Sequence, residues 1–225
     1  MDFKFPHTPH LAWLGPNPPR ADKIFSPGEV DDFLSLPIVV EEKLDGANIG
    51  IFFENGNDSP VVKNRNTVLG ARSHPQFQPL WPWLAAQQPI LYQAMGTRLA
   101  LFGEWCFALH SIHYRNLPAY FNAFDVYDRQ AEKFWSVVRR DRWARELGLA
   151  TVPVVARGTY SLKDLRRLLL NLPSRFGGDP AEGIYLRQDE PNWLCQRAKL
   201  VRPEFVQAIE EHWSKRSLER NTLGL

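Results

Sequence analysis

Residues 38–53, with the sequence IVVEEKLDGANIGIFF, contain two apolar stretches separated by a short polar turn. Ile38–Glu42 and Ala47–Phe53 are rich in β-branched or aromatic side chains, which is typical of β-strands. Lys43-Leu44-Asp45-Gly46 lies between them, and Asp-Gly is a common turn sequence. The sequence therefore predicts two strands, with a lysine at the end of the first.

A lysine at the end of a strand has two interpretations. It can face a pocket, where neighbouring cations lower its pKa and its amine attacks phosphorus. It can also be an ordinary solvated lysine in a tight turn, with Asp45-Gly46 as the turn residues. The tetrapeptide alone does not decide between these readings.

Further elements follow on both sides of this stretch. Ser26-Pro27-Gly28-Glu29 is a capping box with proline at the first helical position, which predicts a short helix over 27–36. Further strands are expected at 61–63, 99–107, 120–127, 151–155, 184–186 and 193–201. Further helices are expected at 76–93, where three prolines interrupt the pattern, and at 132–147, 162–172 and 203–213. Strands in runs, with few βαβ alternations, favour an α+β fold with largely antiparallel sheets.

The 225 residues suit one large domain, for which we expect residues 38–213. Residues 1–37 form a proline-rich lead-in followed by the short helix, and residues 214–225 form a basic tail. The apolar runs are far shorter than the roughly 20 residues of a membrane span, and the first residues lack the features of a secretory signal. Two cysteines permit no disulfide framework, so a cytoplasmic location is expected.

Charge is distributed unevenly along the chain. Residues 1–128 hold 9 Lys/Arg against 13 Asp/Glu, whereas residues 129–225 hold 18 against 12. A basic surface built from the C-terminal half would bind a polyanion. Solvated helix faces at Arg139–Arg145 and Arg166–Arg167 explain the excess equally well, so charge alone does not assign a partner.

Four more short motifs follow the lysine in order, and they favour the first interpretation of Lys43, in which it faces a pocket. They are Phe102-Gly103-Glu104, Phe124-Asp125-Val126-Tyr127, Glu182-Gly183-Ile184-Tyr185 and Arg197-Ala198-Lys199-Leu200. Together with Glu42-Lys43-Leu44-Asp45-Gly46, they resemble the covalent nucleotidyltransferase superfamily of RNA ligases, DNA ligases and mRNA capping enzymes. The resemblance covers roughly 40–205. It implies a single α+β nucleotidyltransferase domain of antiparallel sheets with flanking helices that encloses an ATP pocket.

The resemblance assigns chemistry to particular residues. Lys43 would attack the α-phosphate of ATP and expel pyrophosphate, which leaves a lysyl-AMP. Lys199, Arg197 and a divalent ion, Mg²⁺ or Mn²⁺, would offset the developing negative charge. Glu182 is the best candidate to hold the metal, because hard cations prefer carboxylate oxygens.

Other residues would bind the nucleotide itself. By resemblance, Glu104 contacts the ribose and Phe124 stacks on adenine, with Phe121 the nearest rival for stacking. The remaining residues expected at the ATP site are Glu42, Asp45, Gly46, Asn48 and Arg65. One departure concerns the last motif, which usually has two lysines, whereas Arg197 replaces the first here. Arginine keeps the charge but is not a neutral exchange, so the division of roles between Arg197 and Lys199 stays open.

Two features favour an RNA ligase. Asn48 matches an asparagine in the branch of RNA ligases that seals nicked or broken duplex RNA. The chain also ends 26 residues after Lys199, too few for the oligonucleotide-binding (OB) barrel that follows this motif in DNA ligases and capping enzymes. The expected substrate is RNA with 5′-phosphate and 3′-hydroxyl ends. An end-processing kinase or phosphatase is a candidate partner, but the sequence does not reveal whether such a partner prepares the ends. A minimal DNA ligase and a non-catalytic nucleic-acid-binding module are the alternatives.

Two other features suggest no separate site. His110-x-x-His113 lacks a third metal ligand at suitable spacing. Cys106 lies on a strand predicted to be buried, so a packed thiol is expected there rather than a reactive one.

Overall fold

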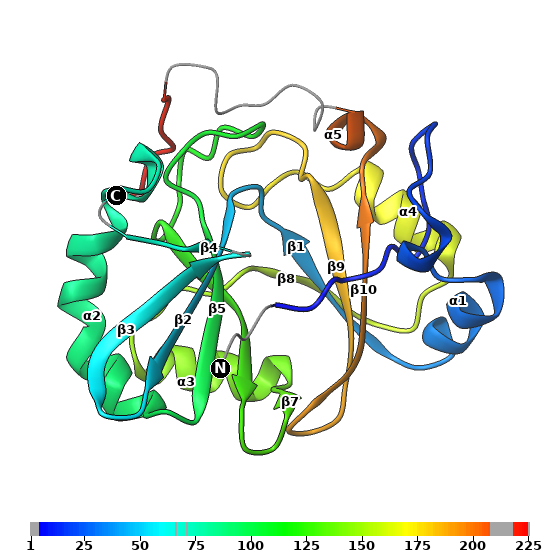
Figure 1. The fold of residues 1–225 in the computed structure, drawn as a ribbon. Coiled ribbons are helices and arrows are strands. Elements are labelled where there is room, and N and C mark those ends of the chain that lie inside the picture. Colours follow the sequence, from blue (N-terminus) through cyan, green and yellow to red (C-terminus); the bar gives the residue numbers. More distant parts are fainter. Residues whose placement is uncertain (1–4, 66, 71, 208–217, 225) are drawn as a thin grey trace.

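The structure is a computed structural model that describes residues 5–65, 67–70, 72–207 and 218–224. Within these ranges the strands form a four-stranded sheet, in the order β10-β9-β1-β8, and a six-stranded sheet, in the order β4-β3-β2-β5-β6-β7 (Figure 1). All strand pairs in both sheets are antiparallel. The predicted α+β fold with antiparallel sheets is therefore confirmed.

The elements have the following bounds. The four-stranded sheet contains β1 (Ile38–Lys43), β8 (Val154–Gly158), β9 (Gly183–Asp189) and β10 (Leu194–Val201). The six-stranded sheet contains β2 (Ala47–Glu54), β3 (Asn57–Asn64), β4 (Thr67–Val68), β5 (Leu99–Trp105), β6 (Phe121–Asp128) and β7 (Lys133–Phe134). The helices are α1 (Pro27–Leu34), α2 (Leu80–Met95), α3 (Val137–Glu146), α4 (Leu162–Leu170) and α5 (Pro203–Gln207), with 3₁₀ turns η1 (Ala21–Lys23) and η2 (Pro75–Phe77).

Successive side chains of each strand point alternately to two faces of its sheet. One face packs on a hydrophobic core with the helices, and the other, here called the inner face, is turned toward the second sheet. In β1, Ile38 and Val40 pack with residues of α1 and α4 in one buried cluster. In β2, Ile49 and Ile51 pack against α2 in a second cluster. Because successive side chains of a strand point to opposite faces, residues such as Lys43 are directed away from these cores. The helices cover the two outer faces of the pair of sheets (Figure 1).

The turn after Lys43 carries the chain from one sheet to the other. β1 ends at Lys43 in the four-stranded sheet, and β2 begins at Ala47 in the six-stranded sheet. A Cβ at Gly46 would lie 2.7 Å from the carbonyl oxygen of Trp105, so only glycine permits this close approach. The turn predicted from Asp45-Gly46 is therefore also the connection between the two sheets.

Several predicted boundaries were wrong. The helix expected at 132–147 begins at Val137, because the Ser136 side chain caps it and Lys133–Phe134 pair with β6 as β7. The strand expected at 151–155 lies at 154–158, where it pairs with β1. Helix α2 extends to Met95 and tolerates Pro89 in its interior.

The capping box at Ser26 and Glu29 is present, and it begins α1 as predicted. The lead-in before it has no helix or strand between residues 5 and 20, but it is bonded to β10. Leu11 donates a backbone hydrogen bond to the carbonyl of Lys199 (2.8 Å), and Lys199 donates one to the carbonyl of Pro9 (3.0 Å). The lead-in thus extends the four-stranded sheet beyond β10.

The C-terminal predictions are only partly described. Of the helix expected at 203–213, residues 203–207 are helical, and residues 208–217 lie outside the described residues, as do Lys215 and Arg216 of the basic tail. Asn221 is buried, and its side-chain amide donates to the carbonyls of Cys106 (2.9 Å) and Ala108 (3.2 Å). This part of the tail therefore packs onto the domain. No helix in the described part of the chain is long and apolar enough to cross a membrane.

Candidate active site

A cavity of about 100 Å³ lies between the inner faces of the two sheets. Both sheets contribute to it, through β1, β9 and β10 on one side and β2, β5 and β6 on the other. Of the residues predicted from the motifs, those lining it are Glu42, Lys43, Asn48, Arg65, Glu104, Phe124 and Lys199. Residues from motifs separated by more than 150 positions thus meet in one place.

Lys43 stands at the end of β1 with its side chain 22% exposed. Its Nζ donates to the carboxylate of Glu182, which closely precedes β9. Burial by itself lowers the pKa of Lys43, but the neighbouring acidic groups, Glu182 first, outweigh it and hold the pKa above the ordinary lysine value. In the free protein this amine is therefore a cation paired with Glu182.

Lys199 is the second cation of the cavity. Burial, together with the charge of Lys43, lowers the pKa of Lys199 to about 8. Arg65 lies at the β3–β4 turn with an exposed side chain and a positive φ of 41°. Since an anion would relieve the repulsion between Lys43 and Lys199, the cavity is suited to a phosphate group.

Asp45 fixes the turn rather than lining the cavity. Its Oδ2 accepts hydrogen bonds from the backbone nitrogens of Ser111 (2.7 Å) and Ile112 (3.3 Å). Its own backbone nitrogen donates to the hydroxyl of Tyr114 (2.7 Å). These bonds hold the turn that presents Lys43.

Glu42, next to Lys43 in β1, also lines the cavity. Its Oε2 accepts a hydrogen bond from the backbone of Arg175 (3.0 Å), whereas its Oε1 is buried with no hydrogen-bond partner among the described residues. Burial raises the pKa of this carboxyl. A buried acceptor without a partner is costly, so a ligand that donates a hydrogen bond would be stabilised here.

The two aromatic candidates lie on opposite faces of the six-stranded sheet. Phe124 is half-buried and lines the cavity. Phe121 is buried in the outer core, with its ring centroid 4.9 Å from that of Trp83. Phe124 is therefore the ring that can stack on a bound base.

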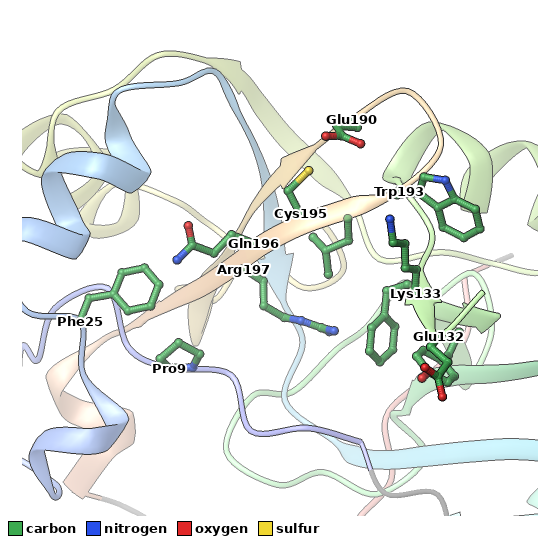
Figure 2. A pocket seen from close by; sticks show the side chains of 12 residues that line it. Pro9, Phe25, Glu132, Lys133, Glu190, Trp193, Cys195, Gln196 and Arg197 are labelled. Atoms are coloured by element: carbon green, nitrogen blue, oxygen red, sulfur yellow. The ribbon is translucent and has the colours of Figure 1, made fainter. Parts of the chain in front are cut away.

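Arg197 does not line this cavity, although it is two residues from Lys199. Its guanidinium bonds to Asp125 (2.5 Å) and lies over the rings of Phe5 and Phe134, 4.9 and 4.0 Å from their centroids. It faces a second pocket of about 610 Å³ (Figure 2). Of the two cations in the last motif, only Lys199 is placed to reach a ligand in the cavity.

Residues 36–201 match the family described as RNA ligase. This match spans well over half of the chain. The chain belongs to the RNA ligase family. Comparison with curated protein sequences gives no match.

Solved structures of a Naegleria gruberi RNA ligase share the fold of this family member. The ligase with pyrophosphate has a TM-score of 0.60 at 19% identity, over 77% of this chain and 52% of that one. A variant with ATP and Mn has a TM-score of 0.64 at 17% identity, over 82% and 54%. A variant with AMP and Mn has a TM-score of 0.61 at 18% identity, over 80% and 54%. This family member spans about half the length of those chains.

Four charged or polar residues that line the cavity of this RNA ligase family member were not predicted as site residues, although two of them, Asp125 and Tyr185, lie within the quoted motifs. These lining residues are Glu41, Asp125, Tyr185 and Arg187. Glu41 is two residues from Lys43 in β1, and Tyr185 and Arg187 alternate along β9. The period of two along these strands places them on the inner face and is the signal that could have found them.

Two further predictions concern groups outside the cavity. Cys106 is fully buried, as predicted, and burial raises the pKa of its thiol well above the ordinary value. His110 lies 4.0 Å from Asp45 and contacts Gln76 (3.1 Å). In the described ranges of this family member, no three His, Cys, Asp or Glu side chains are grouped to hold a metal ion.

Glu104 gives this RNA ligase family member a testable pH dependence. Burial raises the pKa of Glu104 to about 8, above the value of about 4.3 expected in the unfolded chain. The neutral carboxyl therefore contributes stability that is complete at low pH and lost as pH rises through 8. We expect Glu104→Gln, which is always neutral, to melt about 3 °C or more above the wild type at about pH 8.5, and to match it near pH 4.

Thermal melts followed by circular dichroism at both pH values test this. Glu190 is exposed, so Glu190→Gln is the matched control and should show no such pH-dependent gain. An equal melting difference for Glu104→Gln at both pH values would contradict the expected titration.

Proposed function

We propose that this chain is an ATP-dependent RNA ligase that acts through a lysyl-AMP at Lys43. The observation that carries the proposal is the placement of Lys43 in the cavity between the sheets, bonded to Glu182 and accompanied by Lys199. A paired amine and a second buried cation suit a nucleophile and the stabiliser of a phosphate charge. Membership of the RNA ligase family supports the same reading.

The reaction has three steps. Lys43 first loses its ammonium proton to solvent, and the neutral amine attacks the α-phosphorus of ATP. A nitrogen–phosphorus bond forms, and pyrophosphate leaves with the electron pair of the broken bond. The nitrogen then loses a second proton to solvent, which leaves the phosphoramidate. An RNA 5′-phosphate oxygen then attacks the same phosphorus, which releases Lys43 and forms an RNA–adenylate. A 3′-hydroxyl finally attacks the RNA 5′-phosphorus and expels AMP. Lys199 would offset the charge on the α-phosphate in the first two steps.

The residues present fit a divalent ion that shares its ligands with phosphates. Glu182 and Glu104 are the carboxylates next to Lys43, and Mg²⁺ or Mn²⁺ is commonly held by one or two carboxylates, waters and substrate phosphates. Such an ion would supply positive charge that competes with the Lys43 ammonium for Glu182 and favours the neutral amine. The Naegleria ligase variants solved with ATP and Mn accord with this proposal.

Adenine selectivity would come from Glu42. Its free Oε1 can accept a hydrogen bond from the amino group of adenine, whereas guanine presents an oxygen acceptor at the same position. Phe124 in the same cavity tolerates either base, since every base offers a π face. The Glu42 carboxylate would therefore be the group that discriminates between adenine and guanine.

We expect Glu42→Gln to lower the ratio of ATP to GTP used in protein labelling by about tenfold or more, because its amide can donate to guanine. The measurement is labelling by each α-labelled nucleotide across a concentration series. Glu146 lies exposed on α3, so Glu146→Gln serves as the matched control. An unchanged ratio in Glu42→Gln would place base selection elsewhere.

Strand joining separates the RNA ligase from its alternatives. The test uses a nicked duplex, either all RNA or all DNA, with a 5′-phosphate and a 3′-hydroxyl at the nick. We expect the RNA nick to be sealed in the presence of ATP and Mg²⁺, because recognition of the 2′-hydroxyl distinguishes the two. Preferred sealing of the DNA nick would favour a minimal DNA ligase. Failure of both, with no labelling of the protein, would favour a non-catalytic binding module.

A further inference from the structure

The N-terminal segment Phe5–Leu11, here called the strap, crosses from one sheet to the other beside the cavity. It precedes the family match, which begins at residue 36. Figure 1 shows it as the blue chain that runs from β10 toward β5 and β7. Because no motif lies in the strap, we infer its role from its contacts.

The strap is anchored on the four-stranded sheet at two points. Backbone hydrogen bonds join Pro9 and Leu11 to Lys199 of β10. The hydroxyl of Tyr185, on β9, donates to Oγ1 of Thr8 (3.1 Å). Both Lys199 and Tyr185 line the cavity, so these anchors hold the strap at its rim.

On the six-stranded sheet the strap ends in an aromatic cluster. The ring of Phe5 lies 5.0 Å from Phe102, 5.2 Å from Phe124 and 5.6 Å from Phe134, measured between centroids. Its contact with Phe124 is nearly perpendicular, at 82°. Edge-to-face pairs at these distances are favourable and fix the orientation of both rings.

Phe5 also supports Arg197, which in turn contacts the residue next to Phe124. The guanidinium of Arg197 lies over the Phe5 ring (4.9 Å to the centroid) and bonds to Asp125. Arginine can stack on a ring and bond to a carboxylate with the same planar group, which a lysine cannot do. This arrangement is a physical reason for arginine at position 197.

We propose that Phe5 is a positioning residue of the nucleotide site, which holds the Phe124 ring in the orientation that stacks on the base. This inference rests on the proposed function, because it takes Phe124 to be the ring that receives the adenine. Loss of Phe5 removes a ring that packs edge-to-face against Phe124. The ring then samples other orientations, and the base loses part of its stacking energy.

The test measures binding of two probes to the whole chain by calorimetry with Mg²⁺. The first is α,β-methylene-ATP, which has the base but cannot transfer AMP, and the second is inorganic tripolyphosphate, which has no base. We expect Phe5→Ala to weaken α,β-methylene-ATP about tenfold and to leave tripolyphosphate within about twofold. Phe5→Leu, which keeps apolar volume, should fall between Phe5→Ala and the wild type.

Phe25→Ala is the matched control. Phe25 comes from the same lead-in, but its ring packs against Phe33 of α1 in the outer core, 5.7 Å away. It should bind both probes as the wild type does, and melting curves confirm that each variant is folded. A general loosening of the fold would weaken tripolyphosphate as much as α,β-methylene-ATP.

Three outcomes would overturn the role of Phe5: unchanged nucleotide binding in Phe5→Ala, equal weakening of both probes, or tighter nucleotide binding. Tighter nucleotide binding in Phe5→Ala would mean that the strap hinders nucleotide binding in the wild type. A wild type that binds α,β-methylene-ATP but is not labelled by ATP would refute the ligase mechanism and leave the Phe5 inference standing. A wild type that binds no nucleotide would refute both.

Discussion

Replacement of Lys43 by alanine is expected to abolish covalent labelling of the protein by α-labelled ATP and Mg²⁺. In the proposed mechanism the Lys43 amine is the protein group that bonds to the α-phosphorus, so its loss leaves no covalent intermediate. The measurement is radioactivity retained with the protein on a denaturing gel. The bond in the wild type should be labile to acid and stable to base, as a phosphoramidate is.

Two further variants make this test specific. Lys43→Arg keeps a cation beside Glu182 but offers no nucleophilic amine, so it should fold like the wild type and remain unlabelled. Lys163 on α4 lies away from the cavity, and Lys163→Ala should be labelled as the wild type is. Undiminished labelling of Lys43→Ala would remove Lys43 as the nucleophile.

Replacement of Arg187 by methionine is expected to lower the free energy of unfolding by about 3–5 kcal/mol. Arg187 is almost fully buried on β9 and bonds to Asp125 (2.7 Å) and to the carbonyls of Trp135 (2.8 Å) and Phe124 (3.2 Å). Its partners belong to or adjoin the six-stranded sheet, so it ties the two sheets together. Its loss leaves a buried carboxylate short of a partner.

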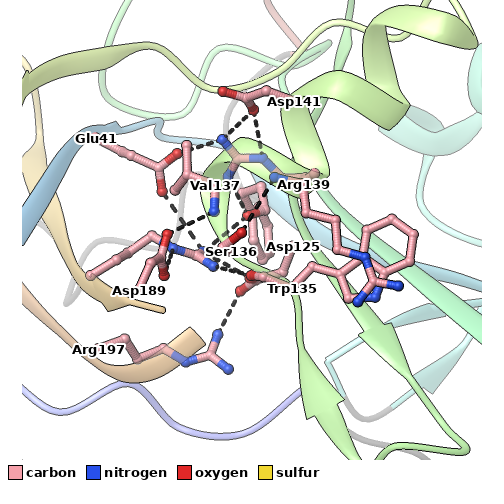
Figure 3. A network of polar contacts seen from close by, with 12 residues as sticks. Glu41, Asp125, Trp135, Ser136, Val137, Arg139, Asp141, Asp189 and Arg197 are labelled. Carbon is pink, nitrogen blue, oxygen red and sulfur yellow. Dashed lines mark hydrogen bonds and ion pairs between the residues drawn. The ribbon is translucent and has the colours of Figure 1, made fainter. Parts of the chain in front are cut away.

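A second arginine completes this network (Figure 3). Arg140 of α3 donates to the carbonyl of Phe124 and to Glu41 of β1, both at 2.6 Å. Glu41 thus has two buried arginine partners, Arg140 and Arg187, and Asp125 shares the second. Burial raises the pKa of Glu41 although both arginines oppose this shift. Both arginines reach the backbone of Phe124, which therefore has a fixed position beneath the cavity.

Urea denaturation of Arg187→Met, compared with Arg167→Met, tests the network. Arg167 pairs with Asp164 on α4, but its side chain is 76% exposed, and exposed ion pairs contribute about 1 kcal/mol or less. We expect a loss several times larger for Arg187→Met, with a melting temperature about 10 °C lower. Equal losses in the two variants would show that the buried network does not hold the sheets together.

The sequence alone did not predict the position of every arginine in the stretch Arg139–Arg145. Its arginines were read either as a solvated helix face or as part of a surface for a polyanion. The Arg140 side chain is instead completely buried among Glu41, Asp141 and the backbone of Phe124. Nothing within a turn of Arg140 in the sequence indicates a partner 99 residues away on another element.

The sequence by itself determined the α+β class, the capped start of α1, the strands on either side of Lys43 and membership of the RNA ligase family. These depend on side-chain alternation, capping and motif order, which act over a few residues or survive as short patterns. Only the tertiary structure decided that Arg197 pairs with Asp125 under Phe5, that Asp45 pins the turn and that the lead-in extends the four-stranded sheet. Each of these joins residues far apart in the chain, and such contacts depend on which strands lie side by side and how closely the two sheets approach.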